Sequence, residues 1–249
     1  MTVLVTGAAG RVGRATVAAL REAGFHVRGL DLVPAPGVHE NVVGSITDPL
    51  VVRTALTGVE TLIHLAATPD DADFHTHLLP NNLVGVYEVL EAARAAEVPR
   101  LLLASTGQVV WWQRHRGPLP VYAEDAPTPR GWYAAAKLFL EAAGRMLAGA
   151  EGRTVLAARL GWCPRDAAQA QEIAASPQAQ DVYLSPGDAG RFFVAAAQMP
   201  LDRQFHIVYV TSKPRQEQAY DPEPAARLGY VPHDTWPIGV EEMLSGTNP

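Results

Sequence analysis

The 249 residues, 48% of them hydrophobic and 18% charged with a formal net charge of −6, are typical of a globular protein rather than a disordered chain. The acidic balance argues against a nucleic-acid-binding surface, and no apolar run of about 20 residues predicts a membrane span. The one cysteine, Cys163, allows no disulfide within the chain, and with no export signal among the first residues we expect a cytoplasmic protein.

Short apolar runs alternate along the chain with segments of helical pattern. The expected strands are residues 3–5, 26–30, 61–65, 101–104, 155–159 and 206–210. The expected helices include residues 12–22, 83–96, 133–147, 192–197 and 222–227. Strands that alternate with helices pair in parallel through right-handed crossovers, with helices on both faces. We therefore predict an α/β fold with a doubly wound parallel sheet.

We expect one domain over residues 1–249, because no Pro- or Gly-rich stretch separates two segments with core patterns of their own. Residues 165–187 are rich in Ala and Gln and show no clear period. We expect residues 160–190 and 205–249 to form a small lobe that covers a ligand cleft.

A glycine-rich turn follows the first expected strand and opens directly into a helix. In the run T-G-A-A-G-R-V-G, the spacing of Gly7, Gly10 and Gly13 suits a tight turn and a close helix. It also lets backbone N–H groups approach a diphosphate at the helix N-terminus. Glycines also end strands for purely structural reasons, so the context of the turn matters.

The second expected strand supplies that context, because it ends at Asp31. A carboxylate at this position can accept hydrogen bonds from a ribose diol and repel a 2′-phosphate. The next residue is Leu32 rather than a base, which predicts NAD. Arg28 and Arg11 are close enough in sequence to leave NADP open.

Tyr133 and Lys137 lie four residues apart on an expected helix, so both project from one face. A nearby ammonium favours the tyrosinate, and such a tyrosine can exchange a proton with a substrate oxygen while hydride moves. The alternative is an amphipathic helix with a half-buried Tyr and a solvated Lys. The strand before them ends in Ser105 and Thr106, whose hydroxyls would meet the ligand crevice. We expect Thr106 to be the catalytic partner, with one of the two hydroxyls only capping the strand.

Two further groups of residues leave alternatives open. Thr68 could reach a substrate, or it could serve only as a turn residue before Pro69. The acidic loop that holds His75 and His77 has no additional His or Cys to complete a ligand set, so we predict no metal site.

Taken in order, these residues resemble the extended short-chain dehydrogenase/reductases, which include the NAD-dependent epimerases and dehydratases. Besides the residues above, the matching segments are 64–67 (H-L-A-A), 82–85 (N-L-V-G), 104–106 (A-S-T) and 159–164 (R-L-G-W-C-P). The resemblance implies a Rossmann-type sheet, Tyr133 as acid/base, Lys137 as its support, Thr106 orienting the substrate and Ser105 beside it. It also implies these NAD contacts: Gly7, Ala9, Gly10, Arg11, Val12, Gly13, Asp31, Ser45, Ile46, Leu65, Ala66, Ala67, Asn82 and Lys137.

Within this family, the chain looks most similar to uronate dehydrogenases, which oxidise C1 of hexuronic acids to lactones. It departs from them at Gly107 and Gln108, where that subfamily has Asn and His, and at Ser45, which replaces an Asp. The subfamily's carboxylate-binding arginine has no match, which leaves Arg165 or Arg191 as substitutes. The implied substrate contacts are Thr68, Gln108, Arg159 and Arg165.

The leading prediction is an NAD-dependent dehydrogenase that acts on the hydroxyl or hemiacetal carbon of a small sugar, sugar acid or polyol. A first alternative is an epimerase or dehydratase that retains NAD and releases no NADH. A second is a non-catalytic dinucleotide sensor, which the presence of Tyr133, Lys137 and Thr106 disfavours. The Ala-rich helices at 83–96 and 133–147 resemble four-helix dimer interfaces of this family, so we expect a homodimer.

Overall fold

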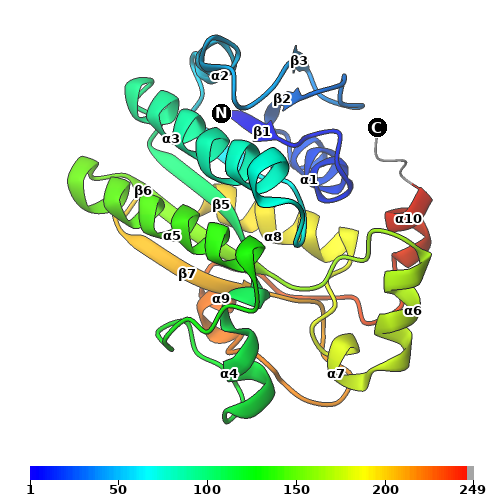
Figure 1. Cartoon of the computed structure of the whole chain (residues 1–249). Coiled ribbons are helices and arrows are strands. Elements are labelled where there is room, and N and C mark those ends of the chain that lie inside the picture. Colours follow the sequence, from blue (N-terminus) through cyan, green and yellow to red (C-terminus); the bar gives the residue numbers. More distant parts are fainter. Residues whose placement is uncertain (246–249) are drawn as a thin grey trace.

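Seven strands of the described chain, residues 1–245, form one parallel sheet in this computed structural model (Figure 1). The strand order is β3-β2-β1-β4-β5-β6-β7. The bounds are β1 (Thr2–Thr6), β2 (His26–Asp31), β3 (Glu40–Val43), β4 (Thr61–His64), β5 (Arg100–Thr106), β6 (Thr154–Leu160) and β7 (Phe205–Val210). The order runs outward in opposite directions from β1 and β4, which confirms the predicted doubly wound sheet of Rossmann type.

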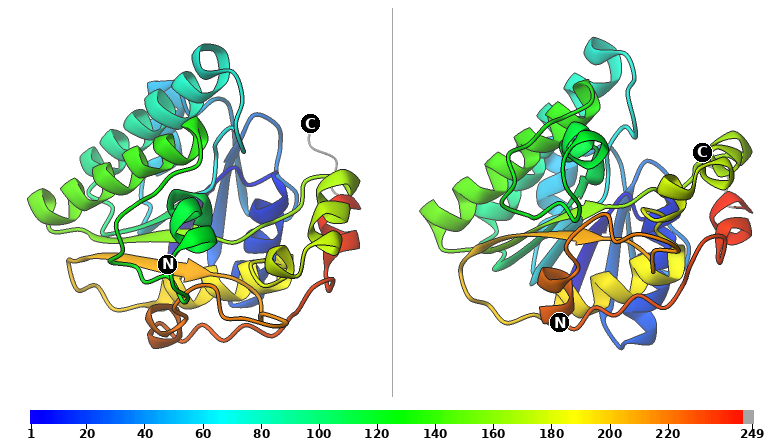
Figure 2. Two further views of the ribbon diagram at one scale, coloured as in Figure 1. Left: turned by 60° about the horizontal axis from the view of Figure 1, so that its bottom comes forward. Right: turned by 90° about the horizontal axis from the view of Figure 1, so that it is seen from below.

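Helices cover both faces of the sheet, as the two further views show (Figure 2). One layer contains α1 (Arg11–Glu22) and α8 (Pro186–Gln198), and the other contains α2 (Pro49–Leu56), α3 (Gly85–Ala95) and α5 (Trp132–Glu151). Val5 and Phe192 are fully buried in the first layer, and Leu4 and Leu140 in the second. Neighbouring residues of β1 therefore serve opposite cores, as the two-residue period of a strand requires.

The elements that were not expected from sequence include β3, α2 and a π-helix. The edge strand β3 is mostly exposed and has no apolar alternation to reveal it. Helix α2 does carry start signals, because the side chain of Asp48 accepts hydrogen bonds from the first turn and Pro49 follows it. The π-helix η1 (Phe74–Val84) begins directly after the acidic residues and contains Pro80, so the helix expected at residue 83 continues from an earlier one.

The remaining short elements gather at the carboxyl edge of the sheet (Figure 1). They are η2 (Gly107–Val110), α4 (Trp111–Arg116), α6 (Ala167–Ala175), α7 (Pro177–Gln180), α9 (Glu223–Arg227) and α10 (Val240–Ser245). Ile173, Ala179, Tyr183 and Trp236 form a small core of their own among them. The expected domain 1–249 and lobe 205–249 end in residues 246–249, which lie outside the described residues, and the covering role of the lobe stays a prediction. No helix within residues 1–245 is long and apolar enough to cross a membrane.

Candidate active site

A cleft of about 760 Å³ opens at the carboxyl ends of the strands, where the strand order reverses. Its walls come from the turn after β1, the ends of β2, β4 and β5, the start of α5 and the segment after β6. Open α/β sheets bind ligands in the crevice at this reversal point. Residues that are far apart in the sequence therefore meet in one cleft.

The turn after β1 has a backbone that only glycine fits. Gly7 has a φ of +69°, and a Cβ there would lie 2.8 Å from the backbone nitrogen of Ala66. A Cβ at Gly13 would overlap with the carbonyl oxygen of Gly7, so helix α1 lies directly against the turn. Gly10 is the N-cap of α1 and supplies no capping side chain. The uncapped N-terminus of α1 thus faces the cleft with free N–H groups.

The residues beside this helix end fit an anionic diphosphate. The Nε atom of Arg11 is buried and has no hydrogen-bond partner within the described chain. Burial and then the charges of Arg14 and Arg165 lower the pKa of Arg11, so these guanidinium groups repel one another. Arg11 and Arg165 both line the cleft. A bound diphosphate would satisfy the Arg11 donor and relieve the repulsion between the arginines.

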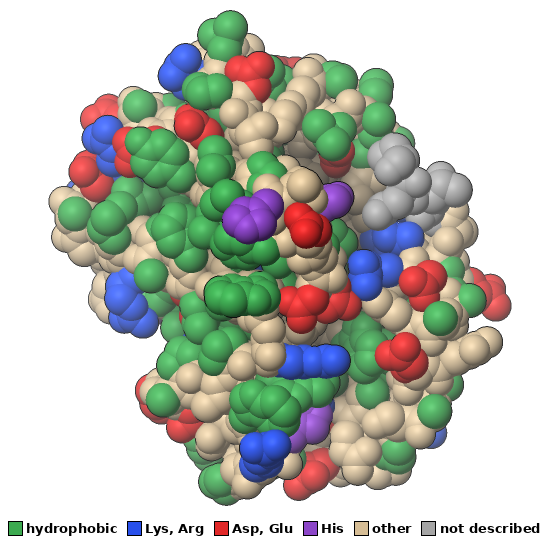
Figure 3. Space-filling view, in the orientation of Figure 1, with side chains coloured by type: hydrophobic (Ala, Val, Ile, Leu, Met, Phe, Trp, Pro, Cys, Tyr) green, Lys and Arg blue, Asp and Glu red, His purple; other side chains and the backbone are tan. Residues whose placement is uncertain are grey.

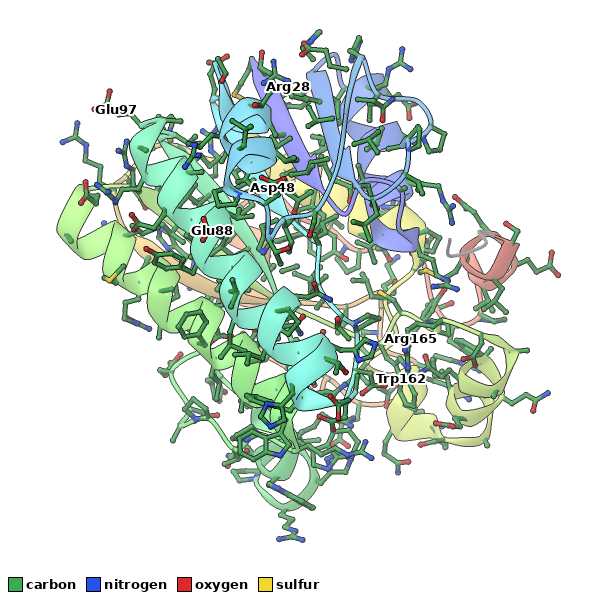
Figure 4. The ribbon with its side chains drawn as sticks, turned by 45° about the horizontal axis from the view of Figure 1, so that its top comes forward. Arg28, Asp48, Glu88, Glu97, Trp162 and Arg165 are labelled. Carbon is green, nitrogen blue, oxygen red and sulfur yellow. The ribbon has the colours of Figure 1, made fainter. Side chains whose placement is uncertain are left out.

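The end of β2 carries a carboxylate whose position is fixed by the backbone. The carboxylate of Asp31 accepts hydrogen bonds from the backbone nitrogens of Ala9, at 2.9 Å, and Leu32, at 2.7 Å. Arg28 is engaged elsewhere, because its guanidinium pairs with Glu40 at 2.8 Å and bonds two backbone carbonyls near the end of α2. Figure 4 shows Arg28 far from Arg165, which lies beside α6. Asp31 and the exposed Leu32 are thus the side chains that define this end.

Most residues expected to contact NAD line the cleft. They are Gly7, Gly10, Arg11, Val12, Gly13, Asp31, Ser45, Ile46, Leu65, Ala66, Ala67 and Lys137. Ala9 lies behind this surface and orients Asp31 through its backbone. Asn82 is buried, and its amide bonds both the backbone nitrogen and the backbone oxygen of Thr68. Asn82 therefore stabilises the loop after β4. A contact between Asn82 and NAD stays a prediction.

The proton-transfer residues expected from sequence come together in the same cleft. Tyr133 is the second residue of α5, and Lys137 follows one turn later with its Nζ atom 5.7 Å from the centre of the Tyr133 ring. The Lys137 ammonium is buried and donates to the carbonyl oxygen of Ala104 at 2.8 Å. Thr106 ends β5 and lines the cleft with both of them. Lys137 is therefore a buried, oriented cation rather than the solvated lysine of the alternative interpretation.

Burial sets the protonation states of these groups. It lowers the pKa of Lys137 to about 8, which leaves the ammonium charged at neutral pH. It raises the pKa of the Tyr133 phenol, and the charge of Asp70 raises it further, so Tyr133 is protonated at neutral pH. Tyr133 can then donate a proton to an oxygen during reduction, and must give up its proton before it can accept one during oxidation.

The structure separates the roles of the two hydroxyls at the end of β5. Ser105 donates its hydroxyl proton to Glu141 at 2.6 Å, on the side of the sheet that α5 covers. The Oγ1 atom of Thr106 accepts a hydrogen bond from the backbone nitrogen of Gln108, so its own proton is free for a ligand. The geometry thus favours Thr106 over Ser105 as the partner of Tyr133.

Arg159 lies outside the cleft, which corrects the expectation that it contacts substrate. It is 1% exposed, and its Nε and Nη2 atoms donate to the two carboxylate oxygens of Glu141 at 3.0 Å each. Its Nη1 atom donates to the Tyr209 hydroxyl at 2.8 Å. With Ser105 bonded to the same carboxylate, every charged or polar group here has a partner. Arg159 therefore ties β6 to α5 and β7.

The other expected substrate residues divide into two groups. Gln108 and Arg165 line the cleft, and both reach Asp70, with Arg165 at 3.1 Å and Gln108 at 3.4 Å. Thr68 does not line it, because its hydroxyl bonds the backbone of η1 and the amide of Asn81. Figure 4 shows Arg165 next to Trp162, which also lines the cleft.

Several cleft residues were missed from sequence. Asp70 and Asp71 line the cleft, and Asp71 accepts a hydrogen bond from the backbone nitrogen of Tyr133 at 2.9 Å. Trp111 and Tyr220 line the cleft as well, and no motif or spacing in the sequence marks either of them as a site residue. Within residues 1–245, no group of three or more His, Cys, Asp or Glu side chains could hold a metal ion.

Comparison with known proteins agrees with this geometry. The model of the NAD dependent epimerase/dehydratase family matches residues 3–161. L-arabinose 1-dehydrogenase (NAD(P)+) of Haloferax volcanii is 31% identical over 96% of this chain and 99% of its own. Uronate dehydrogenase of Pseudomonas putida is 27% identical over 93% and 84% of the two chains.

Solved structures give the same result. Glucuronic acid dehydrogenase from Chromohalobacter salexigens is 27% identical, covers 100% of this chain and 90% of its own, and superposes with a TM-score of 0.79. These three relatives are thus dehydrogenases of a sugar or a uronic acid. Since the family model also spans the glycine turn, Thr106, Tyr133 and Lys137, this chain belongs to the NAD-dependent epimerase/dehydratase family, as the resemblance predicted.

Proposed function

We propose that this protein is an NAD-dependent dehydrogenase that oxidises the hydroxyl of the hemiacetal carbon of a small sugar or sugar acid. The observation that supports this most directly is the single cleft that joins the Gly7 turn to Thr106, Tyr133 and Lys137. A hydride acceptor held at the turn and a proton acceptor at Tyr133 would then act on one substrate carbon.

Each residue would have a separate role in this reaction. Thr106 would hold the reacting oxygen through its free hydroxyl, and Tyr133 would remove the proton from that oxygen. Lys137 would favour the tyrosinate through its charge. The hydride leaves the same carbon for NAD, so a hemiacetal loses two hydrogens and becomes a lactone.

We propose NAD rather than NADP as the cofactor. A 2′-phosphate near Asp31 would meet a carboxylate and the apolar Leu32, while Arg28 is already paired with Glu40. This proposal would give the protein a narrower cofactor range than its Haloferax volcanii relative, whose name includes both cofactors.

The substrate end of the cleft favours a neutral sugar over a uronate. Arg165 is already paired with Asp70. Arg191 pairs with Asp188 and Asp234 and does not line the cleft. A substrate carboxylate would have to displace Asp70, whereas the hydroxyls of a neutral aldose could bond Asp70 and Gln108 as they stand. L-arabinose is therefore the first compound to test, followed by hexuronic acids.

The experiment follows NADH absorbance with NAD and a panel of aldoses, hexuronic acids, polyols and glucose 6-phosphate. In Tyr133→Phe, the loss of the proton acceptor is expected to lower kcat by about 10²- to 10⁴-fold. Tyr122→Phe is the matched control, because Tyr122 is exposed and does not line the cleft. No turnover of any substrate despite tightly retained NAD would favour the epimerase or dehydratase alternative, and no turnover without retention would favour the sensor.

We also propose a homodimer formed through α3 and α5, which pack side by side. Tyr87 on α3 is 56% exposed, and Phe139 and Met146 on α5 are 40% and 57% exposed. Figure 3 shows hydrophobic side chains spread over the face that these helices present. Light scattering after gel filtration should give twice the chain mass for the protein and the chain mass for a Phe139→Glu, Met146→Glu variant.

The cytoplasmic location remains part of the proposal. A chain whose one cysteine can form no internal disulfide suits a reducing compartment.

A further inference from the structure

Tyr220 is a cleft residue from a part of the chain remote from β5. It lies after β7, where backbone hydrogen bonds of 3.0 Å on either side of it pair the segment with Val121. Its ring stacks on that of Tyr209, with ring centres 4.3 Å apart and planes 4° from parallel. Tyr209 in turn is bonded to Arg159. The Tyr220 side chain is therefore fixed on two sides.

The Tyr220 hydroxyl occupies the space of a missing side chain. A Cβ at Gly107 would overlap with the Tyr220 oxygen and would lie 3.1 Å from its Cζ atom. Gly107 directly follows Thr106, whose hydroxyl faces the same cleft. A side chain at position 107 and the Tyr220 ring therefore exclude each other. Because Gly107 has no side chain, the Tyr220 hydroxyl can lie next to Thr106.

This hydroxyl has no partner in the described chain. Tyr220 is 4% exposed and lines the cleft, and no residue within 1–245 forms a hydrogen bond with its oxygen. The charged groups that face it are Arg114 and Arg159, both cationic, and burial nevertheless raises the pKa of the phenol. The hydroxyl therefore stays protonated at neutral pH. Within the described residues the hydroxyl oxygen itself is not fully buried, because it reaches the surface of the cleft, where it can donate a hydrogen bond to a ligand.

We propose that the Tyr220 hydroxyl is a specificity-determining group that hydrogen-bonds a ring hydroxyl of the sugar next to the carbon held by Thr106 and Tyr133. The proposal rests on the proposed function, since it needs a sugar in the cleft. In this proposal Tyr220 provides a substrate contact that Gly107, which has no side chain, cannot provide. Sugars that lack this hydroxyl, or carry it in the other configuration, would leave Tyr220 without a partner and be poor substrates.

The test compares Tyr220→Phe with the unmodified protein over L-arabinose, its epimers and its monodeoxy analogues. Loss of one neutral hydrogen bond, worth about 0.5–1.5 kcal/mol, should raise KM by about 2- to 13-fold and change kcat little. The loss should disappear for the one deoxy analogue that lacks the contacted hydroxyl. Gly107→Ala should displace the ring and raise KM for the same sugars, and Tyr122→Phe should have no effect.

The outcomes separate the two proposals. If the unmodified protein oxidises no sugar, the proposed function fails and the Tyr220 proposal fails with it. If sugars are oxidised but Tyr220→Phe affects every analogue equally or none, only the Tyr220 proposal is overturned. NAD affinity, measured by calorimetry, should be equal in all variants. A variant that no longer binds NAD is misfolded. If Tyr220→Phe is misfolded, the effect of Gly107→Ala on KM tests the Tyr220 proposal instead.

Discussion

Replacement of Arg159 by methionine should unfold the protein at a markedly lower temperature and leave sugar affinity nearly unchanged. The substitution keeps an apolar chain of similar length but removes the guanidinium. Glu141, which is 6% exposed, then has a buried carboxylate with only the Ser105 hydroxyl as a partner. Two hydrogen bonds of 3.0 Å to Glu141 and one of 2.8 Å to Tyr209 are lost.

The expected magnitude follows from the burial of the pair. Removing one partner of a buried ion pair typically destabilises a protein by about 3–5 kcal/mol, because the other charge stays buried. For a chain of this size, about 1 kcal/mol corresponds to roughly 2–4 °C, so Tm should fall by about 6–20 °C. The double variant Arg159→Met, Glu141→Leu removes both charges and should recover part of this loss.

The assay is thermal unfolding by circular dichroism, with steady-state kinetics at a temperature where all variants are folded. Arg191→Met is a useful comparison, because that arginine also pairs with carboxylates but is 35% exposed. Its effect on Tm should be smaller. An unchanged Tm with a large rise in KM for Arg159→Met would refute this reasoning and restore the substrate contact that the sequence implied.

Two further predictions concern Asp31 and His64. The variant Asp31→Asn, Leu32→Arg should raise the ratio of kcat/KM for NADP to that for NAD by roughly 10- to 100-fold, because a charge-assisted hydrogen bond to the 2′-phosphate replaces a repulsion. An unchanged ratio would mean that the adenosine end binds elsewhere. Burial and then the charge of Lys137 lower the pKa of His64 to about 3, whereas an unfolded His has a pKa near 6.5. The unfolded chain therefore binds the extra proton between these values, so His64 contributes stability above pH 6.5 that is lost as pH falls toward 3. Urea unfolding at pH 6.5, 5.5 and 4.5 gives the free energy of unfolding at each pH. This free energy should fall less steeply with pH in His64→Gln than in the unmodified protein, by up to about 1.4 kcal/mol per pH unit, and an equal pH dependence in both proteins would contradict the assignment.

The parts of the site that the sequence predicts are those whose signal is local. The glycine turn, Asp31 and the Tyr133–Lys137 pair are each defined by spacing within one element or at its end. Arg159 shows where this approach fails. Residues next to each other on a strand point to opposite faces, so an arginine near a strand end can meet either the cleft or the covering helix. Only the packing of Glu141 against β6 decides between them.

Tyr220 shows a second limit of reading the sequence. Its role depends on the missing side chain at Gly107, on the pairing with Val121 and on the stack with Tyr209, three contacts between segments that are remote in the chain. No period or motif connects these positions. The departure at Gly107 was visible in the sequence, but the group that fills the space was not.

One face of α5 links stability to catalysis. Tyr133, Lys137 and Glu141 follow one another at intervals of one turn, so all three project toward the sheet. The first two face the cleft, and the third is held by Ser105 and Arg159. The buried ion pair therefore fixes the position of the helix that carries Tyr133 opposite Thr106. Loosening this pair in Arg159→Met should lower Tm and kcat together, whereas Tyr220→Phe should change KM alone, because Tyr220 touches the substrate and does not position the helix.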